Sequence, residues 1–547
     1  MPKTRLLIAA AVIAAPAPAL ADTLFTNANG VQADAAGKIE RFDGLLVGED
    51  GRVKAVLRKG EKRPAAENVV DVGGKAMMPG LIDAHGHVMG LGFAVLQLDL
   101  TGTKSIDELK ERLRKYAADN PGTGWIIGRG WNQELWPTKA FPTAADLDSV
   151  VSDRPVWLGR VDGHASVGNS AALRAAGITP ATKAPEGGRI ENGMFVDAAT
   201  ALVESKIPAP DAATMDRAFR AAQDAMLHVG LVGAADMGTD QTGWDAFRRA
   251  GEAGKLKVRI FSYASALPNW RSINGSKQTG WMYGDRLKLV GTKLYADGAL
   301  GSRGAYLKAP YHDKPDTRGL SLISDAELLA QAGEVAKHGG QLAIHAIGDA
   351  ANAQVIGTYE TLGRQYGKDR RWRIEHLQIA DPTDLPRLKP AGIIASMQPT
   401  HQTSDRLMAE SRLGKNRLGG AYAWKTIANM GVPLAFGSDF PVESPDPFPG
   451  LSAAISRQDP NGQPPGGWRP QERVSLGKAI HGFTVGAAYA GFAETRMGGL
   501  APGKWADFII VDRDPTVVDQ QKLAKTVVLE TWIAGKREFS EAEQHGN

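Results

Sequence analysis

The middle of the chain alternates between short apolar runs and helical patterns, and this alternation constrains the fold more than any other feature. Short apolar runs between turn residues are typical of buried strands. The candidate strands are Leu81–His85, Val156–Arg160, Lys288–Tyr295, Gln341–His345, Arg371–His376, Ile393–Met397 and Pro433–Gly437. Helical patterns occupy Ile106–Ala118, Asp211–His228 and Asp325–His338. Such repetition predicts an α/β fold, a (β/α)8 barrel of the TIM type.

The two ends of the chain differ from this middle part. Residues 22–78 and 497–547 contain short apolar segments split by turns, as at Val53–Val56 after the turn residues Asp50 and Gly51. Both ends are therefore predicted to be β-rich. Residues 79–496 form the barrel domain, and the stretch around 100–200 is longer than one strand–helix unit needs. Because Gly, Pro and Trp are dense there, we expect part of this stretch to be an inserted lid or loop region.

The first 21 residues have the pattern of a signal peptide. Lys3 and Arg5 precede the apolar run Leu6–Ala15, and Ala19–Ala21 has the small residues of a cleavage site. A membrane anchor is the alternative, but a bilayer span needs roughly 20 apolar residues. We expect cleavage after Ala21, a periplasmic or secreted protein, and no membrane span in the mature chain.

Composition narrows the chemistry and the partners. The 547 residues include no cysteine, so any metal must be held by histidine, carboxylate or a modified lysine. The formal charge of +4 is not gathered into a basic stripe, which argues against nucleic acid as a partner. The expected partner is a small-molecule substrate, and the sequence leaves open whether the chain forms a homo-oligomer.

Two motifs on candidate strands carry side chains suited to metal binding. His85 and His87 flank Gly86 at a strand end, where residues two apart point the same way and can share an ion. Taken alone, the pair is also consistent with two exposed or core histidines that bind no metal. Lys293 lies inside an apolar strand and is costly there unless paired or modified. It either pairs with Asp297 or reacts with CO₂ to give a carbamate that bridges two cations.

Three further polar residues end candidate strands. His345 and His376 each close a strand, and Asp439 follows a strand that ends in Gly437 and Ser438. Barrel enzymes place their catalytic groups at these carboxyl ends. For each residue taken singly, a structural role is equally consistent with its position.

In order, these residues resemble the metal-ligand pattern of the amidohydrolase superfamily, on strands one, four, five, six and eight. The chain is most similar to its amidohydrolase 3, YtcJ-like branch from about residue 23 to 537. Supporting motifs are Ala296–Arg303, Arg160–His164, Asn169–Leu173, Ser396–His401 and Pro502–Asp507. The resemblance implies a small β-sandwich built from both chain ends beside the barrel.

The resemblance also implies one or two divalent metals, usually zinc. His85 and His87 would hold one metal, His345 and His376 the other, carbamylated Lys293 would bridge them, and Asp439 would ligate a metal and handle the proton. The implied reaction is hydrolysis of an amide C–N bond in an N-acyl or N-formyl compound by metal-activated hydroxide.

Further residues are candidates for contacts with the substrate. His164 is a candidate oxyanion or substrate contact, with a structural role as the alternative. The weaker candidates are Arg303, Gln398, His401 and Trp131. For Arg303 the alternative is a structural ion pair with Asp297, and for Trp131 it is packing in the core.

Other reactions stay open within this superfamily. Deamination is less favoured, because mononuclear deaminases often carry a glutamate where this chain has Gly348. Cyclic-amide, lactone or ester hydrolysis would use the same hydroxide. A non-enzymatic regulatory role, suggested by the names of some relatives, is disfavoured because the set of metal ligands is complete.

Overall fold

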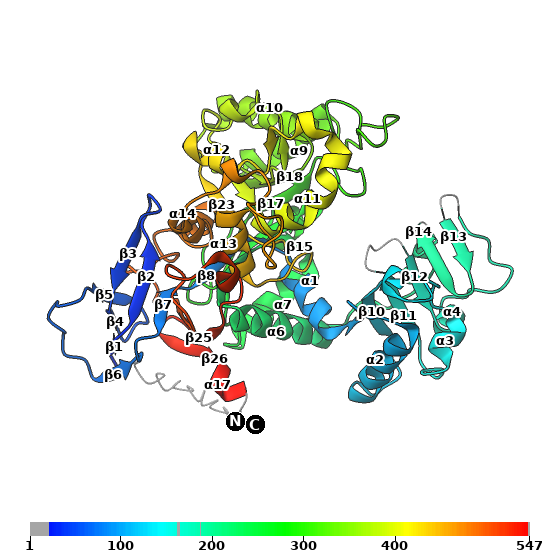
Figure 1. The fold of residues 1–547 in the computed structure, drawn as a ribbon, viewed down its shortest axis with the longest axis horizontal. Coiled ribbons are helices and arrows are strands. Elements are labelled where there is room, and N and C mark those ends of the chain that lie inside the picture. The colour runs from blue at the N-terminus through cyan, green and yellow to red at the C-terminus, as the bar shows by residue number, and fades with distance from the viewer. Residues whose placement is uncertain (1–20, 161–164, 186–187, 198, 545–547) are drawn as a thin grey trace, which may run out of the picture.

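The computed structural model describes residues 21–160, 165–185, 188–197 and 199–544, and its centre is a barrel of parallel strands (Figure 1). The predicted signal peptide falls almost wholly on residues 1–20, outside the described part. Eight strands follow one another around the barrel in chain order. They are β8 (Leu81–Gly86), β15 (Leu231–Thr239), β16 (Arg259–Ser265), β17 (Leu287–Tyr295), β18 (Gln341–Ala346), β19 (Arg373–His376), β21 (Ile394–Met397) and β23 (Leu434–Phe436).

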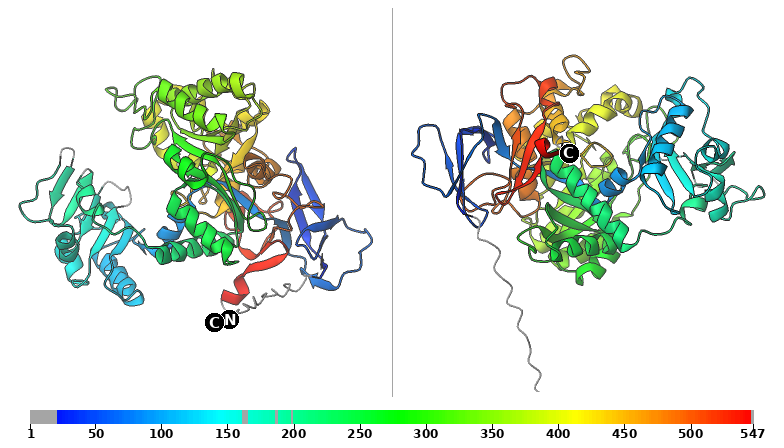
Figure 2. Two further views of the ribbon diagram at one scale, coloured as in Figure 1. Left: turned by 180° about the vertical axis from the view of Figure 1, so that it is seen from behind. Right: turned by 90° about the horizontal axis from the view of Figure 1, so that it is seen from below.

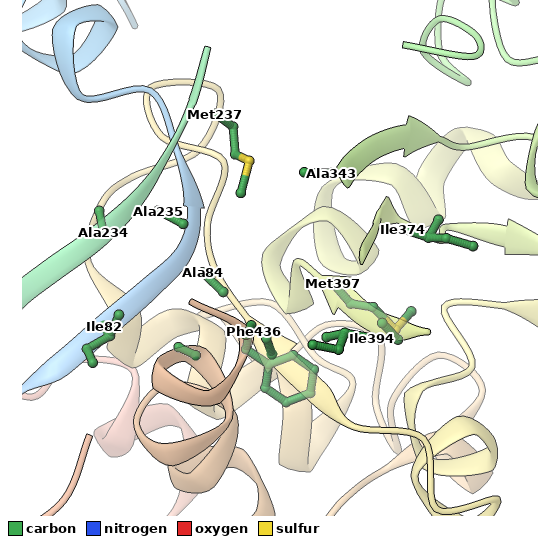
Figure 3. Packing of buried hydrophobic residues seen from close by; sticks show 14 of the residues in the cluster. Ile82, Ala84, Ala234, Ala235, Met237, Ala343, Ile374, Ile394, Met397 and Phe436 are labelled. Atoms are coloured by element: carbon green, nitrogen blue, oxygen red, sulfur yellow. The ribbon is translucent and has the colours of Figure 1, made fainter. Parts of the chain in front are cut away.

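The first and last of these strands lie side by side and nearly close the barrel. The backbone N–H of Asp439 donates to the carbonyl of His85 across the seam at 2.7 Å. Alanine, isoleucine, methionine and phenylalanine side chains from these strands pack into the main hydrophobic core (Figure 3). Because all eight strands are parallel, their carboxyl ends meet at one mouth.

Helices surround the barrel; most lie between successive strands, and the last three follow the final strand. They are α1 (Val88–Leu96), α6 (Ala212–His228), α7 (Gln241–Glu252), α8 (Ala266–Asn274), α9 (Asp325–Lys337), α10 (Asp349–Tyr366), α11 (Pro399–Leu413), α12 (Trp424–Asn429), α13 (Pro447–Ser456), α14 (Leu476–Gly482) and α15 (Val485–Ala490). Local sequence sets their limits: Ser324 caps α9, and Glu327 reaches back to complete a capping box. A two-stranded sheet, β20 (Ile379–Ala380) with β22 (Gly420–Ala421), lies among them.

The structure corrects the predicted strand list in two places. Val156–Arg160 is a strand, β11, but it belongs to the insertion and not to the barrel. The second and third barrel strands, β15 and β16, were not predicted. Strand β15 is rich in glycine and alanine and buried along nearly its whole length, so it lacks both alternation and high β-propensity.

The insertion forms a separate sheet to one side of the barrel, drawn in cyan in Figure 1. Its order is β13 (Gly188–Glu191), β14 (Met194–Asp197), β12 (Ala165–Gly168), β11, β10 (Ile126–Trp131) and β9 (Leu98–Asp99). The associated helices are α2 (Ile106–Asp119), α3 (Ala144–Asp148), α4 (Ser170–Ala175) and α5 (Ala201–Glu204). The unit has hydrophobic cores of its own.

The two chain ends form a β-sandwich, as the resemblance implied. One sheet has the order β5 (Val53–Leu57), β4 (Gly44–Val47), β1 (Thr23–Thr26) and β6 (Asn68–Asp71). The other has the order β26 (Lys536–Ser540), β25 (Val528–Ile533), β24 (Phe508–Val511), β7 (Ala76–Pro79), β2 (Asn29–Ala33) and β3 (Ile39–Phe42). A shared core packs the two sheets together, and Figure 2 shows N-terminal strands in blue beside C-terminal strands in red.

Shorter elements complete the chain. They are the helices α16 (Gln520–Leu523) and α17 (Glu541–Gln544) and four 3-10 turns at Gln133–Leu135, Leu385–Arg387, Lys415–Arg417 and Pro470–Glu472. Within the described ranges, no helix combines the length and the apolar character that a membrane crossing requires.

Candidate metal centre

The barrel mouth brings together the histidines and the aspartate that end different strands. Ligand atoms of His85, His376 and Asp439 all lie within 4.8 Å of one another, and the three residues are buried. His87 joins them, with its Nε2 atom 3.0 Å from Asp439 Oδ1. The ring centres of His345 and His376 are 4.5 Å apart. Side chains from β8, β18, β19 and the loop after β23 therefore form one cluster.

Lys293 points into the same cluster from β17. Its Nζ atom lies 3.3 Å from His85 Nε2, and the residue is only 1% exposed. Among the described residues, no carboxylate lies within 4.0 Å of this amine. The alternative pairing with Asp297 is therefore not formed. Burial lowers the pKa of Lys293 to about 8, which increases the fraction of neutral, nucleophilic amine near neutral pH.

The donor atoms in this cluster are arranged to bind a cation. His85 Nδ1 lies 2.6 Å from Glu375 Oε2, so the ring donates there and its Nε2 lone pair faces the cluster. That lone pair is 3.5 Å from the buried Asp439 Oδ1, which also lies 3.0 Å from His87 Nε2. A cation bound among these atoms would be stabilised by the imidazole lone pair and by the carboxylate charge. Nitrogen and carboxylate donors from three or more side chains are the set that zinc prefers.

Burial and nearby charges favour the protonation states that bind a metal. Burial lowers the pKa of His85 to about 4 and that of His345 to about 3, with Lys293 adding to both effects. The pKa of His376 is also well below its usual value, chiefly because the ring is buried. For Asp439, burial alone would raise the pKa, but the nearby histidines His85 and His87 hold it below its usual range. Neutral imidazoles and an ionised carboxylate are the forms that bind metals.

Backbone geometry at two of these residues is unusual. His376 has φ of 74° and Asp439 has φ of 64°, in the left-handed region that few residues other than glycine adopt. Strand alternation would turn Glu375 and His376 to opposite faces of β19. Nevertheless both contact His85, because the positive φ redirects the His376 ring, whose centre lies 4.7 Å from that of His85. Strain of this kind is concentrated at functional sites.

A buried ion pair beneath the cluster orients His85. Arg373 Nε donates to Glu375 Oε1 at 2.7 Å, and its Nη2 atom donates to Oε2 at 3.0 Å. Neither residue is exposed. Burial raises the pKa of Glu375, but Arg373 and His85 outweigh it and bring the pKa down to about 2. The ionised carboxylate fixes the ring and its tautomer, as outer partners of metal-binding histidines do. The sequence pattern predicts no role for either residue.

Two other buried aspartates hold the mouth together. Asp83 accepts from the backbone N–H of His85 and of Ser438, which ties the first strand to the last. Asp297 accepts from three backbone N–H groups, of Tyr306, Ile347 and Gly348. Burial raises the pKa of each carboxyl to about 7. Both therefore shape the backbone around the cluster.

The predicted substrate contacts fall in different places. Gln398 Oε1 accepts from His376 Nδ1 at 2.9 Å, so Gln398 orients a histidine of the cluster. His401 lies in the first turn of α11, with Nε2 3.7 Å from Asp439 Oδ2. Arg303 pairs with Asp313 at 3.0 Å, and not with Asp297 as its alternative reading had it.

The two remaining candidates do not join the cluster in the described structure. Trp131 is enclosed in the core of the insertion, with no exposed surface, and its indole N–H donates to the Leu158 carbonyl at 2.8 Å. Core packing, the alternative reading, accounts for it. His164 lies outside the described residues.

A cavity of about 210 Å³ opens beside His87. Met89, Phe93 and Met215 supply apolar walls, and Asp236 and Thr239 supply polar ones. The volume is smaller than the roughly 300–1,000 Å³ of pockets for drug-sized ligands. It therefore suits a small substrate group next to a histidine of the cluster.

An eight-stranded barrel with this cluster at its mouth defines a metal-dependent hydrolase. The chain belongs to the amidohydrolase family, whose model matches residues 68–538.

Individual relatives agree with this assignment. The chain is 32% identical to the putative amidohydrolase YtcJ of Bacillus subtilis, over 91% of this chain and 96% of that protein. It is 28% identical to an N-substituted formamide deformylase of Arthrobacter pascens, over 94% and 97% of the two chains. The crystal structure of an uncharacterized metal-dependent hydrolase from Pyrococcus horikoshii is 28% identical, with a TM-score of 0.77 over 91% of this chain and 99% of that one.

Proposed function

We propose that this protein hydrolyses the amide C–N bond of a small N-acyl or N-formyl compound, using one or two zinc ions. The observation that carries the proposal is the pair of acceptors, His85 Nε2 and Asp439 Oδ1, which lie 3.5 Å apart beside three more histidines and a lysine. The similarity to a formamide deformylase along nearly the whole chain supports a C–N substrate.

The ligand assignment follows the positions of the side chains. His85 from β8 and His87 directly after it would hold one ion, and His345 and His376 would hold the other. Asp439 would both ligate a metal and face the substrate. Lys293 would bridge after its neutral amine adds to CO₂, which gives a carbamate and releases one proton. The lowered pKa of Lys293 and its buried position near His85 favour that reaction. A bound zinc ion would lower the pKa of water toward 7 and polarise the substrate carbonyl.

Asp439 is the residue placed to move protons. Its carboxylate is ionised at neutral pH, is only 7% exposed and lies at the mouth, where a substrate enters. It accepts a proton from the attacking water and returns it to the leaving nitrogen, which makes the amine a stable product. His401, 3.7 Å away, and Gln398 line the same side of the cluster. His164 is proposed as a further oxyanion or substrate contact.

We also propose that the protein is exported. Cleavage after Ala21 would release the mature enzyme into the periplasm or the medium, and its substrate would be a small molecule available there. Sequencing the N-terminus of protein recovered from the periplasm or medium tests this, with Asp22 expected as the first residue.

The test of the reaction is a substrate screen on zinc-loaded protein. Matched N-formyl and N-acetyl derivatives of the same amines are assayed for amine release, beside an ester, a lactone and an aminopurine. We expect amine release from at least one amide, and its loss in Asp439→Asn. Turnover of the ester, lactone or aminopurine alone would contradict amide hydrolysis and favour the corresponding reaction of the superfamily.

A further inference from the structure

A second concave site lies at the opposite end of the barrel from the metal cluster. It is a cavity of about 670 Å³ between α6, the end of α7, the segment before β16, and β26. This volume falls within the roughly 300–1,000 Å³ of small-molecule pockets. The barrel strands begin at this end, so the cavity and the metal cluster are separated by the full length of the barrel interior.

The walls of this cavity carry a surplus of positive charge. Two carboxylates, Asp224 and Glu538, line it. Five cationic side chains face them, a surplus of three, and they come from four separate segments: Arg220, Lys255, Lys257, Arg286 and Lys536.

The two carboxylates are already shared by two of the lysines. Lys257 Nζ lies 4.0 Å from both Asp224 and Glu538, and Lys536 Nζ lies 3.5 Å from Glu538. In the described ranges, no carboxylate comes within 4.0 Å of the charged groups of Arg220, Lys255 or Arg286. The surplus is therefore not neutralised within the chain.

Neutral contacts with the backbone hold these cations in place. Gln223, itself buried, accepts from the Lys257 N–H at 2.7 Å and donates to the Lys255 carbonyl at 3.3 Å. Leu256 between them is buried, which leaves the two lysines turned outward. The half-buried Arg286 guanidinium donates to the Lys257 carbonyl. Asp507, a buried carboxylate whose charge acts on Arg286, is already bound by both Nε and Nη2 of Arg259.

We propose that this cavity binds a small organic anion carrying two or three negative charges on phosphate or carboxylate groups. Like charges held together raise the free energy of the folded chain, and an anion in the cavity would offset that cost. Guanidinium groups recognise both kinds of oxyanion through paired N–H donors. The site is separate from the metal cluster, so the proposal does not depend on which reaction the enzyme catalyses.

The test is calorimetric titration of the full-length mature protein at constant ionic strength. Inorganic pyrophosphate is the phosphate probe and propane-1,2,3-tricarboxylate is the carboxylate probe. We expect one-site binding of at least one probe, and the tighter probe identifies the chemistry of the natural ligand. Zinc content is measured before and after each titration, because both anions also bind zinc.

The decisive variant is the double substitution Arg220→Gln with Lys255→Gln. Both side chains are exposed and unpaired, so the fold should be kept, while binding should weaken at least about tenfold, or 1.4 kcal/mol. The control is Lys425→Gln, an exposed lysine on α12 outside the cavity, which should bind as wild type does. Saturable binding that is equal in all three proteins, or no saturable binding of either probe, would overturn the proposal.

Discussion

His85 and Glu375, 290 positions apart in sequence, are joined by a contact of 2.6 Å between Nδ1 and Oε2 at the base of the metal cluster. This contact links the first barrel strand to the sixth and sets which nitrogen of His85 faces the other ligands. It depends in turn on Arg373, which neutralises the carboxylate. The orientation of His85 in the metal cluster therefore depends on a buried ion pair.

Substituting Glu375 with glutamine should weaken the site without reshaping it. We expect a 10- to 100-fold loss of zinc affinity, about the range for outer partners of metal-binding histidines. Stability should fall by roughly 3–5 kcal/mol, since Arg373 is left buried and unpaired. Competitive zinc titration and urea unfolding measure the two effects. The matched control is Glu360→Gln, which breaks a surface pair with Arg387 of the same 2.7 Å length and should cost less than about 1 kcal/mol.

The same pair predicts how stability depends on pH. The pKa of Glu375 is about 2 in the folded chain against 4.5 for an ordinary glutamate, so its stabilisation is present above 4.5 and is lost as the pH falls through about 2. The shift corresponds to about 3 kcal/mol. Unfolding free energies of wild type and Glu375→Gln should therefore converge as the pH falls below about 4. A gap that stays constant down to about pH 2 would contradict this assignment.

Lys293→Ala should abolish activity by removing the proposed bridging carbamate. Short-chain carboxylates such as propionate should partly restore it, because their two oxygens can occupy the bridging position. Carbon NMR of protein incubated with labelled CO₂ should show a carbamate signal that Lys293→Ala lacks. Lys288→Ala, a half-buried lysine on the same strand, is the control and should keep both signal and activity. A carbamate signal that survives Lys293→Ala would refute the assignment.

Asp439→Asn should separate proton transfer from metal binding. Asparagine keeps the shape and much of the ligand capacity but cannot accept a proton, so kcat should fall at least about a hundredfold with zinc retained. Rate measurement and metal analysis on the same sample provide the test. Near wild-type turnover with normal zinc content would assign the proton transfer to another group, His164 first.

The sequence could predict much of this site, for an identifiable reason. His85, Lys293, His345, His376 and Asp439 each end or interrupt an apolar strand, so their position is visible in the chain itself. Strands β15 and β16 were missed because glycine and alanine take up four of the nine residues of β15, and β16 opens with the buried Arg259. Arg373 and Glu375 look like ordinary strand residues. Their role depends on a contact with His85 across the barrel and on the positive φ of His376, which no local pattern predicts.

The measurement that tests the central claim most directly is the zinc content of purified, zinc-loaded protein after removal of free metal. Wild type should retain at least one ion per chain, and the double variant His85→Ala with His376→Ala should retain less than about a tenth of that, since each ligand set loses a histidine. The exposed His338, directly after the end of α9, provides the control, and His338→Ala should match wild type. Zinc-free wild-type protein, or equal zinc in the double variant, would contradict the account.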